Sequence, residues 1–219
     1  MNVLWTRLEA LAKKAKKPLG LRKGVSEKTL AAAEKKMKLA LPSDFRASLL
    51  LHDGQEGEQD ELFEWMPGCS PLASLDAIVT QWADELENVE DADDEAVDED
   101  PRLHRAIFHA KRVPIAGTPY WDGDNTHVDL FPGPKGTSGQ LVTFVTECDR
   151  VVLGESFSAA LTSYADALES GAWKGASSRE HGSQAFADYL VQAAKKSKRA
   201  ASASTAEAHV SPAKKKAKK

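Results

Sequence analysis

The sequence predicts an α+β fold in which a mostly antiparallel sheet is packed by helices. Apolar residues first recur at helical spacing through the N-terminal quarter of the chain. Four strand-like segments then follow within residues 112–153, separated by turn residues. The gaps between these segments are too short for helical crossovers, so neighbouring strands should run antiparallel. A chain of 219 residues has room for one such domain and its extensions.

Three helices are expected in the N-terminal part. The first is broken by Pro18, and the second begins after an N-cap at Ser26. The third has Pro42 in its first turn and Gly54 in the position of a terminating C′ glycine. The positions that define their buried faces are, in chain order, Leu4, Leu8, Leu11 and Ala15; Leu30, Ala33 and Met37; Phe45, Leu49 and His52.

A short strand and a fourth helix should follow. Residues 62–66 read Leu-Phe-Glu-Trp-Met, which is typical of a strand, and Ser74 then caps a helix with apolar residues at helical spacing. From Asp84 to Asp100 the chain carries eleven acids and no Lys or Arg. Like charges four residues apart repel on a helix, so the helix should end inside this acidic run and a mobile loop should follow.

The strands expected next span residues 112–116, 126–130, 140–145 and 150–153, and a helix over 156–170 ends at Gly171. A shorter helix is predicted over 184–194. From Lys195 onward mostly Ala, Ser and Lys remain, and such a segment buries too little apolar surface to offset its ordering entropy. We therefore expect a domain over 1–175, a helical extension over 176–194 and a disordered Lys-rich tail over 195–219.

The net charge of −4 hides a strong partition of charge. Residues 1–40 carry a net +8, residues 41–194 a net −20 and residues 195–219 a net +8. This asymmetry indicates charged partners or self-association. No apolar run approaches the length of a membrane span, and Met1–Arg7 lacks the pattern of a signal peptide, so a cytoplasmic protein is expected. Cys69 and Cys148 are expected to be reduced thiols.

Two corners of the chain, residues 52–55 and 129–140, contain candidate functional residues. Each is a short apolar run that stops at Gly, Pro or Asp and closes on Gly-Gln. Glycine serves where the backbone takes φ > 0 or where another segment comes close, so the corners predict a shaped backbone surface. Their residues, with one aromatic from the turn before the second strand, are expected to contact a partner or to hold the framework: His52, Asp53, Gly54, Gln55, Trp121, Asp129, Gly133, Pro134, Gly136, Gly139 and Gln140.

Three segments together resemble a known family. They are the LPSDF-R-SLLLHDGQ segment of residues 41–55, the HVDLFPGPKGTSGQLV segment of residues 127–142, and the ESFSAALTSYADALESGAW segment of residues 155–173. In this order they resemble the SUKH superfamily, and most nearly its fungal cell-wall-assembly regulators and their bacterial relatives, from about Leu4 to Trp173. The resemblance implies a non-catalytic α+β domain that binds other proteins. Many bacterial members are taken to be immunity proteins against secreted toxins.

Three other residue patterns resemble catalytic, metal-binding or phosphate-binding sites. His127 and Asp129 lie two apart on a strand and share a face, which suits a metal-ligand pair or a base with its orienting acid, but no third ligand follows. We expect them to be a surface pair on the exposed face of the sheet. The Asp-rich turn at 121–125 lacks the glutamate of a calcium loop, and the glycines of 133–139 are followed by a strand, unlike a phosphate-binding loop. The sequence predicts neither an enzyme nor a cofactor or metal.

The C-terminal tail carries a second candidate function. Its cations resemble those of linker-histone tails, which bind polyanions through counterion release without reading sequence. They are Lys195, Lys196, Lys198, Arg199, Lys214, Lys215, Lys216, Lys218 and Lys219. The resemblance implies a protein-binding module, acting as an immunity, regulatory or scaffolding protein, and the acidic body favours a basic partner. The alternative is a nucleic-acid-associated protein that acts through this tail.

Overall fold

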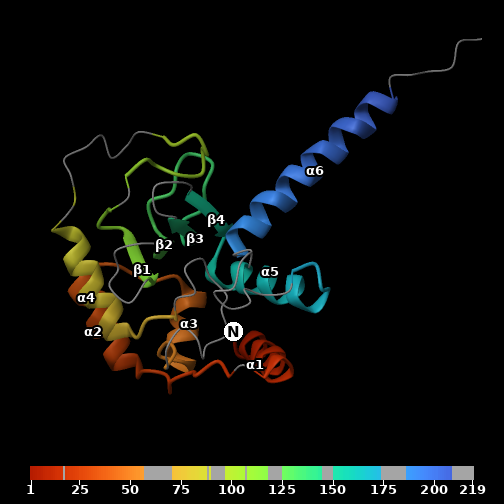
Figure 1. Ribbon diagram of the computed structural model, residues 1–219. Helices are drawn as coiled ribbons and strands as arrows, with labels where there is room; N and C mark the ends of the chain where they lie inside the picture. The colour runs from red at the N-terminus through yellow and green to blue at the C-terminus, as the bar shows by residue number, and fades with distance from the viewer. Residues whose placement is uncertain are drawn as a thin grey trace, which may run out of the picture.

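The computed structural model describes residues 1–16, 18–56, 71–87, 89, 97–106, 108–117, 125–144, 150–173 and 186–208, with backbone alone for 144 and 198–208. The α+β class is confirmed (Figure 1). Along the described residues the elements are α1 (Asn2–Ala15), α2 (Glu27–Met37), α3 (Ser43–Leu51), α4 (Leu75–Leu86), β1 (Arg112–Ala116), β2 (Asn125–Asp129), β3 (Gln140–Phe144), β4 (Arg150–Gly154), α5 (Phe157–Glu169) and α6 (Phe186–Ala208).

Side-chain caps fix the start of three helices. Ser26, Ser74 and Ser156 each accept a hydrogen bond from the backbone N–H three residues further on, at the starts of α2, α4 and α5. The caps predicted at Ser26 and Ser74 are therefore confirmed. The end of α3 differs from the prediction, because its C-cap is His52 in an extended conformation and Gly54, with φ of 72°, lies in the turn beyond it.

The described strands form a four-stranded sheet in the order β1-β2-β3-β4, and each neighbouring pair is antiparallel, as the short connections predicted. Isolated bridges prolong the ladder on the far side of β1. Leu72 bridges Ala116, the Gln55 N–H donates to the Leu72 carbonyl at 2.9 Å, and Gln55 bridges Leu21. Extended segments from the N-terminal half thus continue the sheet. The strand predicted over residues 62–66 lies outside the described residues.

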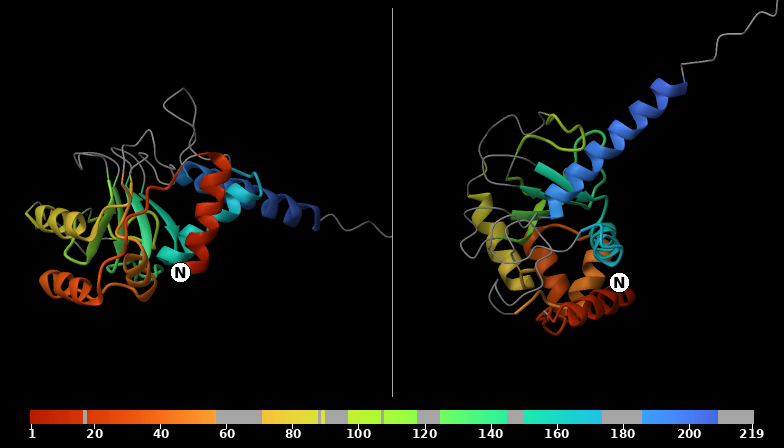
Figure 2. Two further views of the ribbon diagram at one scale, coloured as in Figure 1. Left: turned by 90° about the horizontal axis from the view of Figure 1, so that it is seen from below. Right: turned by 45° about the vertical axis from the view of Figure 1, so that its right-hand side comes forward.

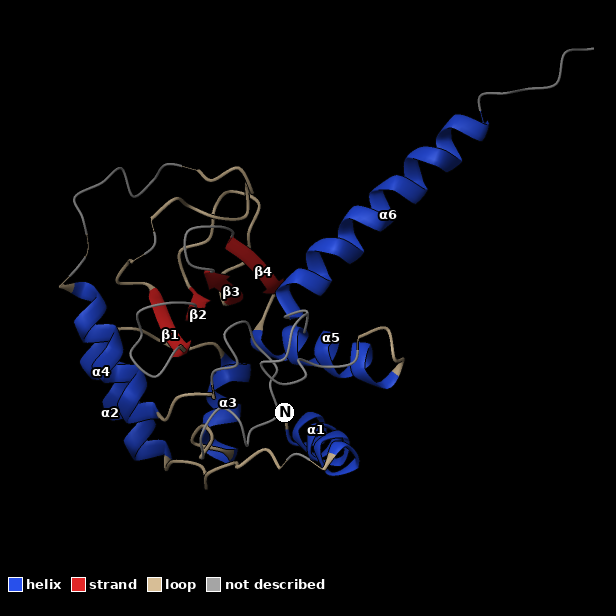
Figure 3. Ribbon diagram, viewed as in Figure 1, coloured by secondary structure: helices blue, strands red, loops and turns tan. Residues whose placement is uncertain are grey.

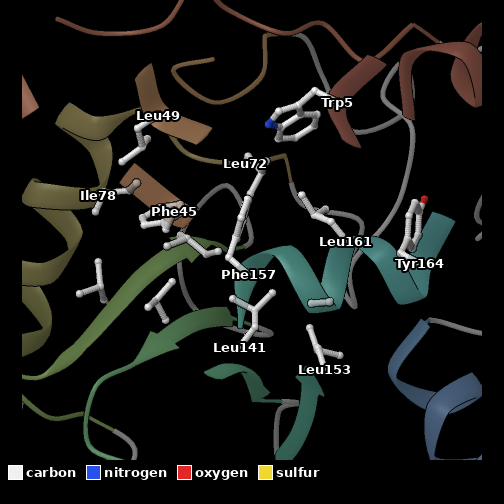
Figure 4. Packing of buried hydrophobic residues seen from close by; sticks show 14 of the residues in the cluster. Trp5, Phe45, Leu49, Leu72, Ile78, Leu141, Leu153, Phe157, Leu161 and Tyr164 are labelled. Carbon is white, nitrogen blue, oxygen red and sulfur yellow. The ribbon is translucent and has the colours of Figure 1, made fainter. Parts of the chain in front are cut away.

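One face of the sheet forms the main core with the helices (Figures 3 and 4). Val113, Val128 and Leu141 point to this face from neighbouring strands and are fully buried. Helix α5 supplies Phe157, which packs against Phe45 of α3 with ring centroids 5.0 Å apart. Helix α1 packs on α5, and α2 packs on α4. The alternation of core and non-core positions is what a sheet with one helix-covered face requires.

The other face of the sheet is covered by the segment 97–106. Leu103 of this segment is buried against Val142 of β3 and Val152 of β4. Several other positions of this face carry polar side chains that are almost fully buried, among them Arg112, His127 and Gln140. Since a buried polar group is costly without a partner, this face depends on hydrogen bonds to the covering segment.

Helix α6 leaves the body of the protein (Figures 1 and 2). At its start Phe186 packs against Trp173 and Tyr164, with ring centroids 5.1 and 5.2 Å away. The side chains of residues 194–197 are exposed, yet the helix continues to Ala208. The helix predicted over 184–194 is therefore longer in the structure, and residues 209–219 of the expected tail lie outside the described residues. Ala, Lys and Arg favour helix without any packing, which explains the difference.

Candidate functional site

The first corner, His52–Gln55, forms hydrogen bonds to two other segments of the chain. The buried Gln55 amide donates from Nε2 to the Leu19 carbonyl at 2.8 Å and accepts at Oε1 from the Leu72 N–H at 2.9 Å. Asp53 Oδ1 accepts from the Leu75 N–H at 2.6 Å, at the start of α4. The corner therefore joins the end of α3 to the segments before α2 and α4.

Gly54 makes this approach of segments feasible. Its φ is 72°, and a Cβ at this position would lie 2.5 Å from the carbonyl oxygens of Leu72 and Ala73. A larger residue would have to push both carbonyls away, in a backbone conformation that side chains disfavour. His52 sets its ring edge-on against Trp5 of α1, with centroids 5.3 Å apart. Its position is thus fixed within the helical packing.

The second corner is built around the buried carboxylate of Asp129. Oδ1 accepts from Arg112 Nε at 3.3 Å and from the Phe131 N–H at 2.9 Å. Oδ2 accepts from Gln140 Nε2 at 3.0 Å. Burial lowers the pKa of the fully enclosed Arg112 guanidinium, and the charge of Asp129 opposes that shift. Arg112 also donates from Nη2 to the His104 carbonyl at 3.2 Å, which ties the covering segment to the sheet.

The loop from Gly133 to Gly139 lies against the same covering segment. The Gly133 N–H donates to the Arg102 carbonyl at 2.8 Å, and Gln140 Nε2 donates to this oxygen at 2.9 Å. A Cβ on Gly136 would lie 2.4 Å from it. Gly139 has φ of 91°, a conformation that favours glycine. Gly136 does not have a positive φ, and a side chain is excluded there by the nearby Arg102 carbonyl. Pro134 is exposed at the tip.

The two corners lie at opposite ends of α3 and of β1. Gly139 faces Pro42 at the start of α3, and a Cβ there would be 3.0 Å from the proline ring. His52 caps the other end of α3, about 13 Å further along a nine-residue helix. The corners also lie at opposite ends of β1, since Asp129 pairs with Arg112 and Leu72 with Ala116.

His127 is not on an exposed face, contrary to the sequence expectation. It is fully buried, and its Nε2 lies 3.1 and 3.2 Å from the two carboxylate oxygens of Glu85 at the end of α4. Asp129 shares the face but engages Arg112 instead. The face is enclosed by other parts of the chain, because Glu85 of α4 reaches His127 and Leu103 of the segment 97–106 packs on Val142. Among the described residues no group of three or more His, Cys, Asp or Glu side chains could hold a metal ion.

Sequence reasoning missed Glu85 and Arg112 as partners in this buried layer. Glu85 was one of many acids in its run, and Arg112 began an otherwise apolar strand. A basic residue at the start of an otherwise apolar strand was the available signal, since a buried cation needs a partner.

The central part of the chain matches the model of a known protein family. The model described as the SMI1 / KNR4 family (SUKH-1) matches residues 24–163. This chain belongs to the SMI1 / KNR4 family. The matched region contains both corners and the whole sheet. It is shorter at each end than the resemblance expected from sequence, and leaves out α1 and α6.

Two fungal relatives share about a quarter of their aligned residues with the chain. A "Glucan synthesis regulatory protein" of Neurospora crassa is 26% identical over 193 residues, which span 70% of this chain and 35% of that protein. The "Cell wall assembly regulator SMI1" of Saccharomyces cerevisiae is 25% identical over 186 residues, which span 68% of this chain and 36% of that protein. The chain thus matches only about a third of the length of these relatives.

The remaining sequence-predicted site residues divide into two groups. Lys195 and Lys196 are exposed on α6, and Lys198 and Arg199 belong to the same helix by their backbone. The others lie outside the described residues, namely Trp121, Lys214, Lys215, Lys216, Lys218 and Lys219. In the described part of the chain no helix combines the length and apolar character that crossing a membrane requires.

Proposed function

We propose that this member of the SMI1 / KNR4 family is a non-catalytic protein-interaction module that recognises a basic partner. In this proposal the two corners are framework, because their buried side chains bind other parts of the same chain. The relatives' names as regulators support a regulatory or scaffolding partner over a toxin. Recognition then falls to the exposed surface of the acidic body.

The observation that carries the proposal is the placement of acids at the end of α4. The exposed acids Asp84 and Glu87 lie at its C-terminal end, and its last turn contains no basic residue. A helix C-terminus carries a partial negative charge, so each exposed acid there costs about 0.3–1 kcal/mol. Local stability argues against this arrangement, and such conflicts are expected at functional surfaces. A cationic partner surface would relieve the repulsion.

The experiment compares two neutralised variants of equal charge. The test variant replaces three exposed acids of the run, Asp84→Asn, Glu87→Gln and Glu99→Gln. The control replaces three exposed acids elsewhere, Asp76→Asn, Glu155→Gln and Asp188→Asn. A protein captured by the wild-type chain from cell extract is purified, and its association rate with each variant is measured at about 50 and about 300 mM salt.

The test variant should associate about tenfold more slowly than the control at low salt, and the difference should shrink at high salt. Equal rates for the two variants would show that the run is only a solvated surface. A captured toxin would redirect the proposal from regulation to immunity. A captured protein processed into a new product would contradict the non-catalytic assignment.

A second candidate function has its own structural support. The side chains of Lys195 and Lys196 are exposed on helix α6, which projects from the body of the protein (Figure 1). Cations on a projecting helix can contact phosphates without any change in the folded domain. Nucleic-acid association through the C-terminal segment therefore stays as the alternative.

A further inference from the structure

A groove of about 520 Å³ lies between the end of α1 and the segment that follows it. Its walls combine buried apolar side chains, such as Ala12 and Leu19, with the exposed lysines Lys13 and Lys16. The full lining is Glu9, Ala12, Lys13, Lys16, Pro18, Leu19, Gly20 and Leu21.

The segment along this groove is the outer edge of the extended sheet. The Gly20 carbonyl accepts from the Glu56 N–H at 2.6 Å, and the Arg22 N–H donates to the Gly54 carbonyl at 3.1 Å. In antiparallel pairing, the residue between two such bonds directs its own N–H and C=O to the opposite side. Leu21 is that residue, and within the described part of the chain no backbone hydrogen bond uses its peptide groups. An open edge of this kind is a template for another strand.

The charge around the groove selects the kind of strand. Lys13 and Lys14 lie in the last turn of α1 and Lys16 is its C-cap, against one acid, Glu9, in the lining. Lysines at a helix C-terminus complement the helix dipole, which explains their placement on α1. Because they also lie beside an open strand edge, an incoming strand would pass within reach of their ammonium groups. Carboxylates on that backbone would be favoured over cations.

We propose that this groove binds an extended acidic segment of a partner protein. The segment adds a strand by hydrogen bonding to the Leu21 peptide groups and places its carboxylates beside Lys13 and Lys16. Its apolar side chains rest on the floor formed by Ala12 and Leu19. The surface is independent of the acidic run at the end of α4 and has the opposite charge, so the protein would join an acidic segment to a basic partner.

The probe is a fluorescein-labelled decapeptide of alternating Glu and Val, titrated with the full chain at low salt. The test variant is the pair Lys13→Glu with Lys16→Glu. The chain offers a closely matched control in Lys35→Glu with Lys38→Glu, because α2 also ends with a lysine in its last turn and a left-handed lysine C-cap. The C-cap φ angles are 59° at Lys16 and 55° at Lys38, so backbone strain is equal in the two variants.

Binding of the Glu–Val peptide should weaken about tenfold in the test variant and stay near wild type in the control. The same peptide with alternate backbone nitrogens methylated should lose binding to the wild-type chain, because it cannot complete the strand pairing. Three results would overturn the proposal: equal loss in both variants, undiminished binding of the methylated peptide, or equal binding of a Lys–Val peptide. Displacement by a single-stranded oligonucleotide at equal concentration would assign the groove to polyanions in general. Failure of this test would leave the basic-partner experiment unaffected.

Discussion

Gln55 and Gln140 use their side-chain amides in the same way. Each donates to a backbone carbonyl of a distant segment, Leu19 or Arg102, and each accepts a backbone N–H at its oxygen. An amide side chain carries the donor and acceptor of a peptide unit, so it can pair with strands and loops where the main chain cannot reach. Glutamate would lose the donor and bury a charge instead.

Substitution of Gly136 should destabilise the fold more than substitution of Gly139. Gly136→Ala places a Cβ 2.4 Å from the Arg102 carbonyl oxygen and 2.7 Å from Pro132 Cβ, and is expected to destabilise the fold by roughly 2–4 kcal/mol. Gly139→Ala should cost roughly 1 kcal/mol, from strain at φ of 91°. Urea unfolding of both variants measures the difference. Equal losses would mean that the loop yields at Gly136.

The buried pair Arg112–Asp129 should show strong coupling. Asp129→Leu leaves a guanidinium in an enclosed site, and Arg112→Met leaves a carboxylate there, so each is expected to cost about 3–5 kcal/mol. The double variant leaves neither charge behind and should retain more stability than either single variant. A double-mutant cycle in urea checks this. Simple addition of the two losses would show that the charges do not interact.

At the scale of elements, α1 is joined to α5 by Arg7. Its guanidinium donates to Glu169 at 2.6 and 2.7 Å and to Asp166 at 2.5 Å. The hydrogen bonds from Arg7 hold the pKa of Glu169 below its usual value. A carboxylate with a depressed folded-state pKa stabilises the protein above its unfolded-state pKa, and this stabilisation is lost as pH falls through the folded-state pKa. The link therefore operates at neutral pH and disappears in acid.

Glu169→Gln removes this ion pair and should lower the melting temperature at pH 7. The effect should be slight, because nearly half of the Glu169 side chain is exposed. The difference from wild type should shrink as the pH drops below about 4. Thermal melts across this range measure it, with Glu155→Gln as an exposed control. A difference that persists in strong acid would assign the effect of Glu169 to packing rather than charge.

The far part of α6 should contribute little to folding. Deleting residues 195–219 removes a helical segment whose first side chains, at 195–197, are exposed, and an unsupported helix is marginal. The melting temperature should stay nearly unchanged, while retention of DNA in a gel shift at low salt should be lost. Deleting only 209–219 separates the terminal lysines from those on the helix. Retention that survives the longer deletion would place the nucleic-acid surface on the folded domain.

For the whole molecule, local chemistry made much of the fold predictable. The features that predicted it depend on residues close in sequence: the caps at Ser26 and Ser74, the helical spacing of apolar residues and the short turns. The burial of His127 was not predictable, because its partner Glu85 comes from the end of α4, 42 residues away in sequence. The separation of the two corners was equally hidden, since it follows from where α3 and β1 lie relative to each other.

The two glutamine contacts have a practical consequence for dissecting this protein. Gln55 hydrogen-bonds to Leu72, and Gln140 to Arg102, so a fragment cut between the members of either pair lacks part of its hydrogen-bond set. A fragment that ended before Leu72 would expose an amide and an apolar floor that the native protein conceals. Truncated pieces used as bait would therefore collect ligands that the intact chain never meets. Mapping by surface substitution in the full chain avoids these false positives.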